Sequence, residues 1–97
     1  MSADDSTSRR DFRVHGVVQG VGFRWSAARR AEALGLRGWV KNCADGSVEV
    51  GAQGTAAALD QFEDWLRRGP RGARVERVDR IRSSLAIPDE GFVIARD

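Results

Sequence analysis

Residues 14–24 read Val-His-Gly-Val-Val-Gln-Gly-Val-Gly-Phe-Arg, and they decide how the rest of the chain is interpreted. The β-branched valines at the start are typical of a strand, whereas the glycines at positions 20 and 22 interrupt it. Helical periodicity follows, so the stretch predicts a strand, a glycine-rich turn and the first turn of a helix. The unpaired amides and the dipole at a helix N-terminus favour a bound anion.

Arg24 follows this turn, in the first turn of the predicted helix. Its guanidinium is permanently charged and can bind two phosphate oxygens at once. The stretch therefore fits either a cradle for a phosphate or carboxylate group or a tight turn beside a surface arginine. It lacks the Gly-Lys-Ser/Thr ending of a Walker A loop, and Trp25 stands where a dinucleotide-binding fingerprint has its third glycine.

The composition of the 97 residues is that of one small globular domain. Hydrophobic residues make up 41% and charged residues 31%, and no apolar run is long enough to span a membrane. No secretory signal is recognisable, and one cysteine with one histidine can form neither an internal disulfide nor a dedicated zinc site. We expect a cytoplasmic protein with no metal or other cofactor, with residues 1–10 as a flexible tail and 11–97 as the folded domain.

The charged residues are mixed along the chain rather than clustered. Of the 16 basic residues, 15 are arginine and only Lys41 is lysine, yet 14 acidic residues keep the net charge at +2. An arginine-rich composition is compatible with phosphate or nucleic-acid contacts. Because acids alternate with the arginines, we interpret most of them as solvated surface charges. We expect no nucleic-acid or membrane partner, and a monomer.

The pattern of apolar residues predicts the order strand, helix, strand, strand, helix, strand, and one short final strand. Strands are expected at 11–18, 37–42, 47–53, 74–81 and 91–95, and helices at 22–34 and 55–68. Each helix has one apolar stripe at helical spacing. The stripe residues are Phe23, Ala27, Ala31 and Leu34 in the first helix, and Leu59, Phe62 and Leu66 in the second.

Two helices on one face of an antiparallel sheet would bury both stripes. The predicted fold class is therefore α+β, a ferredoxin-like α/β sandwich with βαββαβ order. In that arrangement the first strand is central, so the glycine-rich turn that leaves it is supported on both sides. Such a rigid support suits an anion cradle.

Two motifs resemble the two signatures of the acylphosphatase family. The first is V-x-G-x-V-Q-G-V-G-F-R at residues 14–24, and the second is G-W-V-K-N-x-x-x-G-x-V-x-x-x-x-x-G at residues 38–54. The resemblance extends over roughly residues 11–95. It implies hydrolysis of the carboxyl–phosphate bond of small acyl phosphates to a carboxylate and inorganic phosphate, without a metal or a covalent intermediate. It also implies the ferredoxin-like fold.

The resemblance implies roles for individual residues. Arg24 matches the family's phosphate-binding arginine, and Asn42 matches the asparagine that orients the attacking water. These two are the predicted catalytic residues. The predicted substrate-binding residues match the loop whose backbone surrounds the phosphate: Gln19, Gly20, Val21, Gly22 and Phe23.

His15 and Lys41 leave alternatives open, whereas Cys43 does not. His15 is either a general base or a strand residue beside the loop, and Lys41 either adds charge near the site or is a solvated strand residue. Cys43 is interpreted as a turn residue, because Glu49 stands where a cysteine-phosphatase loop has its arginine.

Two other functions compete with hydrolysis. An RNA-binding domain of this fold would have aromatic residues on its third strand, and residues 47–53 contain none. The other is carbamoyl phosphate handling, as in the related domain at the start of a hydrogenase-maturation protein. That function predicts poor turnover of simple acyl phosphates.

Overall fold

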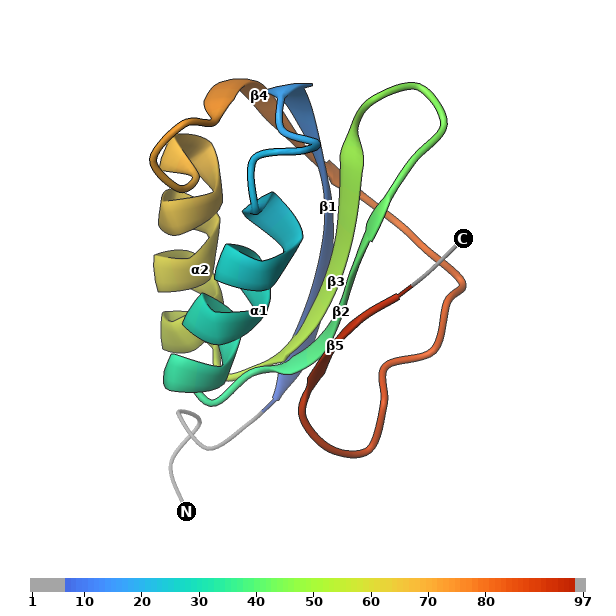
Figure 1. The fold of residues 1–97 in the computed structure, drawn as a ribbon. Coiled ribbons are helices and arrows are strands. Elements are labelled where there is room, and N and C mark those ends of the chain that lie inside the picture. The colour runs from blue at the N-terminus through green and yellow to red at the C-terminus, as the bar shows by residue number, and fades with distance from the viewer. Residues whose placement is uncertain (1–6, 96–97) are drawn as a thin grey trace.

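The computed structural model describes residues 7–95, in which two helices pack on one face of a five-stranded sheet (Figure 1). The predicted order of elements is confirmed, and most boundaries agree within one or two residues. The strands are β1 Ser8–Val17, β2 Arg37–Asn42, β3 Val48–Gly54, β4 Arg74–Ile81 and β5 Phe92–Ile94, and the helices are α1 Phe23–Ala33 and α2 Ala56–Arg68.

The strand order in the sheet is β4-β1-β3-β2-β5. The first four strands are antiparallel, which confirms the ferredoxin-like sandwich with β1 in the centre. The expectation of a wholly antiparallel sheet is wrong in one respect, because β5 pairs with β2 in parallel. The chain that leaves β4 crosses the sheet to its far edge instead of turning back beside β4. It therefore meets β2, which runs in the same direction as β5.

The core lies between the helices and the sheet. Phe12 and Val14 of β1 are fully buried in one hydrophobic cluster with the α2 stripe of Leu59, Phe62 and Leu66. The α1 stripe belongs to the same cluster, with Phe23, Ala27 and Ala31 buried and Leu34 packed against it, so both predicted stripes face the sheet. Thr55 caps α2 as its position suggests, with Oγ1 accepting a hydrogen bond from the Ala58 amide at 3.2 Å.

The first strand is longer than predicted. It begins at Ser8, and residues 8–10, which we assigned to the tail, pair with residues 52–54 of β3. Residues 1–6 of the predicted tail and residues 96–97 of the predicted domain lie outside the described residues.

The segment between β4 and β5 covers the helix-free face of the sheet, where Trp39 is 1% exposed. The buried carboxylate of Asp11 accepts a hydrogen bond from the Ser83 amide at 2.9 Å. Arg9 donates to the carbonyl oxygens of Ser83 at 3.1 Å and Leu85 at 2.6 Å. These bonds hold the crossing segment on the sheet and thereby place β5 beside β2.

Candidate active site

The loop between β1 and α1 ends in a helix N-terminus with free amides. Gly20 and Gly22 have φ angles of 77° and 75°, a left-handed conformation that glycine adopts without strain. Gly22 precedes α1, whose first turn has no side-chain cap and no acidic residue. The Ser26 amide donates to the Gly22 carbonyl oxygen at 3.0 Å and makes the first intrahelical bond. The amides before Ser26 are therefore directed at any ligand beyond the helix end.

The side chain of Gln19 connects this loop to the β2–β3 turn. Its Nε2 donates to the carbonyl oxygens of Cys43 and Ser47, each at 2.8 Å. The same two residues close the turn, since the Cys43 amide donates to the Ser47 carbonyl oxygen at 2.8 Å. Loop and turn are thus held as one unit.

Asp45 stabilises the turn from its other side. Its Oδ1 accepts hydrogen bonds from the Ser47 amide at 2.9 Å and from the Ser47 hydroxyl at 2.5 Å. These hydrogen bonds hold the pKa of the Asp45 carboxyl below its ordinary value. The Asp45 carboxyl is therefore ionised at neutral pH, where it accepts both hydrogen bonds.

Asn42 is the last residue of β2, where it pairs with Val48. Its Oδ1 is buried and has no hydrogen-bond partner among the described residues. A buried acceptor without a donor is uncommon in proteins and points to a ligand or a water molecule as its partner.

A pocket of about 270 Å³ brings Arg24 and Asn42 together. Arg24 is partly buried and forms no ion pair with the residues that the structure describes. The residues that line the pocket are Val18, Gly20, Gly22, Phe23, Arg24, Trp25, Asn42 and Ile94. The pocket thus combines a free guanidinium, the helix amides and an unpaired amide oxygen.

Two of the predicted substrate-binding residues do not line this pocket. Val21 is partly buried and packs on the core, and the Gln19 side chain is directed at the β2–β3 turn. Side chains at these positions hold the loop in place, whereas Gly20, Gly22 and Phe23 border the pocket.

His15 and Lys41 lie away from the pocket. The Nε2 of His15 is 3.2 Å from Asp79 Oδ2, and Lys41 lines a different hollow with Arg13 and Glu49. Both residues alternate along their strands with residues of the helix side, so they belong to the opposite face of the sheet. Neither is placed to act as a base or charge beside Arg24.

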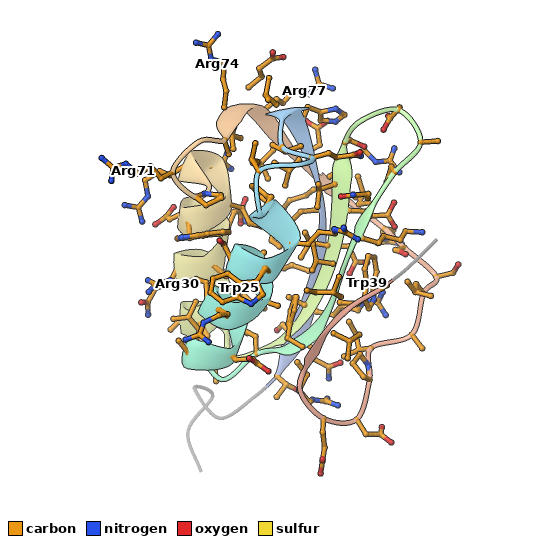
Figure 2. The ribbon with its side chains drawn as sticks, viewed as in Figure 1. Trp25, Arg30, Trp39, Arg71, Arg74 and Arg77 are labelled. Carbon is orange, nitrogen blue, oxygen red and sulfur yellow. The ribbon has the colours of Figure 1, made fainter. Side chains whose placement is uncertain are left out.

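The three tryptophans do not form one stacking surface. Figure 2 shows Trp25 on α1 and Trp39 on the sheet, and Trp65 of α2 packs against Phe23 and Phe62 with ring centroids 5.7 and 6.4 Å apart. The described residues also contain no group of three or more potential metal ligands, and none of their helices is long and apolar enough to cross a membrane.

A model of the acylphosphatase family matches residues 10–94. The chain belongs to the acylphosphatase family. The resemblance of the two motifs is thereby confirmed over nearly the whole described domain. In the structure, the pocket has lining residues from both of the segments that carry the two motifs.

Relatives named acylphosphatase are similar to this chain over most of its length. One from Synechococcus sp. strain RCC307 is 56% identical over 68 residues, which are 70% of this chain and 58% of that protein. One from Yersinia pseudotuberculosis serotype O:1b is 58% identical over 66 residues, which are 67% of this chain and 72% of that protein.

Solved acylphosphatase structures have the same fold. The protein from Coxiella burnetii has a TM-score of 0.83 at 34% identity, covering 98% of this chain and all of that one. The protein from Bacillus subtilis has a TM-score of 0.82 at 33% identity, covering 93% of this chain and 99% of that one. HypF from T. kodakarensis has a TM-score of 0.73 at 30% identity, but the match covers only 12% of its chain.

Two residues that line this pocket have no role in the prediction from sequence. The position of Trp25 next to Arg24 is the signal that could have indicated it. Ile94 gave no signal, because β5 reaches the pocket only through the crossing of the chain over the sheet.

Proposed function

We propose that this acylphosphatase hydrolyses small acyl phosphates in the pocket between the β1–α1 loop and β2, without a metal ion. The observation that carries the proposal is the meeting of Arg24, the uncapped N-terminus of α1 and the unpaired Oδ1 of Asn42 around one pocket. Positive groups and a lone acceptor around one pocket suit an anion and a water molecule side by side.

The phosphoryl group is bound by the loop amides and by Arg24. Phosphoryl transfer needs positioning and stabilisation of the equatorial oxygens more than covalent assistance. The Arg24 fork and the amides before Ser26 provide donors that are already oriented, so little reorganisation is needed in the transition state.

Asn42 orients the water. Its Oδ1 accepts a hydrogen bond from the water, which directs a lone pair of the water oxygen at phosphorus. The water oxygen–phosphorus bond forms as the bond between phosphorus and the carboxyl oxygen breaks. The carboxylate leaves with the bonding electrons, and the proton of the water passes to a phosphate oxygen. No general base is needed, because a carboxylate is a good leaving group.

The test is hydrolysis of benzoyl phosphate in excess EDTA by the wild type, Arg24→Ala and Asn42→Ala, with Arg71→Ala as the matched control. Arg71 projects into solvent from the segment between α2 and β4 (Figure 2). We expect metal-independent turnover that falls at least about 10²-fold in both site variants and is unchanged in the control. Loss of turnover in EDTA would contradict the metal-free mechanism. Wild-type turnover in Arg24→Ala or Asn42→Ala would contradict the assigned roles.

A further inference from the structure

We propose that Trp25 and Ile94 bind the acyl group of the substrate, so that this enzyme prefers acyl phosphates with an aromatic or bulky apolar acyl group. The inference rests on the proposed function, since it assigns the part of the same pocket that the phosphoryl group does not use. It adds a determinant of substrate class to a site otherwise defined by its phosphate contacts.

The exposure of the lining residues separates the pocket into two parts. Val18 and Phe23 are 1% and 2% exposed and form its floor, and Gly20 and Gly22 belong to the phosphate cradle. The accessible apolar surface in the pocket therefore comes from Trp25, which is 61% exposed, and Ile94, which is 39% exposed. Apolar side chains beside a few convergent polar groups are typical of a small-molecule site.

Each of the two apolar residues stands beside one of the proposed catalytic residues. Trp25 directly follows Arg24 in the first turn of α1. Ile94 is opposite Val40 in the parallel pair of β5 with β2, two residues before Asn42. A separation of two residues along a strand is about 7 Å. An acyl group attached to a phosphoryl group in the cradle therefore extends within reach of both side chains.

A contact with a neighbouring side chain favours one orientation of the Trp25 indole before a substrate binds. The guanidinium carbon of Arg29, one helical turn further on, lies 5.0 Å from the centroid of the Trp25 ring. This cation–π contact restricts the ring at an otherwise exposed position. A ring that is already ordered loses less conformational entropy when it contacts a ligand.

The pocket volume suits a small acyl group. At about 270 Å³ it lies just below the range of about 300–1,000 Å³ that is usual for drug-sized ligands. It accommodates a phosphoryl group with one ring or a short branched chain. A long acyl chain would project into solvent.

The experiment compares kcat/KM for benzoyl phosphate and acetyl phosphate in the wild type, Trp25→Ala, Trp25→Phe, Ile94→Ala and Leu85→Ala. The two substrates differ in intrinsic reactivity, which cancels when their ratio is compared between variants. We expect Trp25→Ala to lower the benzoyl-to-acetyl ratio about threefold to tenfold, mainly through the KM for benzoyl phosphate. Ile94→Ala should lower it less, and Trp25→Phe should restore most of it.

Leu85 is the matched control, since it is 41% exposed but lies with Trp39 on the opposite face of the sheet. Its replacement should leave the ratio unchanged. Turnover of both substrates with an unaltered ratio in Trp25→Ala and Ile94→Ala would overturn this inference and leave the proposed function intact. A folded wild type that hydrolyses neither substrate would overturn the proposed function, and this inference with it.

Discussion

The side-chain amide of Gln19 lies 2.8 Å from the carbonyl oxygen of Cys43, the residue that follows Asn42. This hydrogen bond connects the loop that precedes Arg24 to the strand end that carries Asn42. A second bond from the same nitrogen to Ser47, also at 2.8 Å, fixes the far side of the turn. The relative position of the two proposed catalytic residues thus depends on one amide group that does not itself line the pocket.

Replacing Gln19 by Ala should therefore impair catalysis without touching the substrate. Removal of the donor frees the loop from the turn, and a displacement of about 1 Å in a catalytic group can cost 10²-fold in rate. We expect kcat for benzoyl phosphate to fall about 10- to 100-fold while the chain stays folded. Gln61→Ala, at an exposed position of α2, is the matched control. Steady-state kinetics measures kcat and far-UV circular dichroism measures folding in each variant. An unchanged kcat in Gln19→Ala would contradict the positioning role.

Arg24→Lys should separate the charge of Arg24 from its geometry. Lysine keeps the positive charge but cannot bind two phosphate oxygens in a planar fork. We expect kcat/KM for benzoyl phosphate to fall at least about tenfold and the inhibition constant of inorganic phosphate to rise, since both depend on bidentate binding. Arg71→Lys should change neither quantity. If Arg24→Lys binds inorganic phosphate with an inhibition constant close to that of the wild type, only a point charge is required at this position.

Gly22→Ala should disturb the cradle through its backbone alone. A Cβ on Gly22 would meet no atom within 4 Å, but its φ of 75° is unfavourable for alanine by about 1–2 kcal/mol. We expect a loss of stability of that size in urea unfolding, together with weaker inhibition by phosphate. Gly22→Asn should be milder, because asparagine tolerates the left-handed conformation better.

Gly51→Ala is the steric counterpart of this substitution. A Cβ there would lie 2.5 Å from Trp39 Cε2, on the face of the sheet opposite the pocket. Overpacking of this kind costs about 1–3 kcal/mol. We expect a comparable loss of stability with phosphate inhibition retained. A loss of phosphate binding in Gly51→Ala equal to that in Gly22→Ala would contradict the local role of Gly22.

Glu63 should make stability depend on pH. It is 6% exposed in α2, and Arg80, Arg67 and Arg10 donate to its carboxylate at 2.7, 3.0 and 3.3 Å. Burial by itself would raise the pKa of Glu63, but the hydrogen bond and charge of Arg80, with the other arginines, outweigh it and hold the pKa below its ordinary value of 4.5. The folded state therefore favours the ionised carboxyl more than the unfolded state does.

The stabilisation by Glu63 is then fully present above about pH 4.5 and is lost as pH falls through the lowered pKa. We expect Glu63→Gln to lower the free energy of unfolding by about 1–3 kcal/mol at pH 7 and by progressively less as pH falls below 4.5. Urea unfolding at pH 7 and at a series of lower pH values measures this change, with Glu76→Gln at an exposed position of β4 as the control. An equal loss at every pH would show that the contribution of Glu63 does not depend on its charge.

Local sequence was sufficient for most of the fold. Periodicities of two and of about 3.6 residues located each strand and helix. The errors have tertiary causes. Residues 8–10 are polar and were assigned to the tail, yet they form strand because residues 52–54 of β3 offer them hydrogen-bond partners. The direction of β5 depends on which edge of the sheet its chain reaches.

For the candidate site, too, some features follow from the sequence and others only from the tertiary structure. The motifs of the sequence by themselves determined the family and predicted the phosphate loop and the two residues Arg24 and Asn42, because the motifs are short segments of fixed spacing. Only the tertiary structure decided that Gln19 anchors the loop, that His15 and Lys41 lie on the other face, and that Trp25 and Ile94 border the pocket. Those relationships join segments distant in the chain, and the packing of α1 and β5 across the sheet brings them together, which no local pattern records.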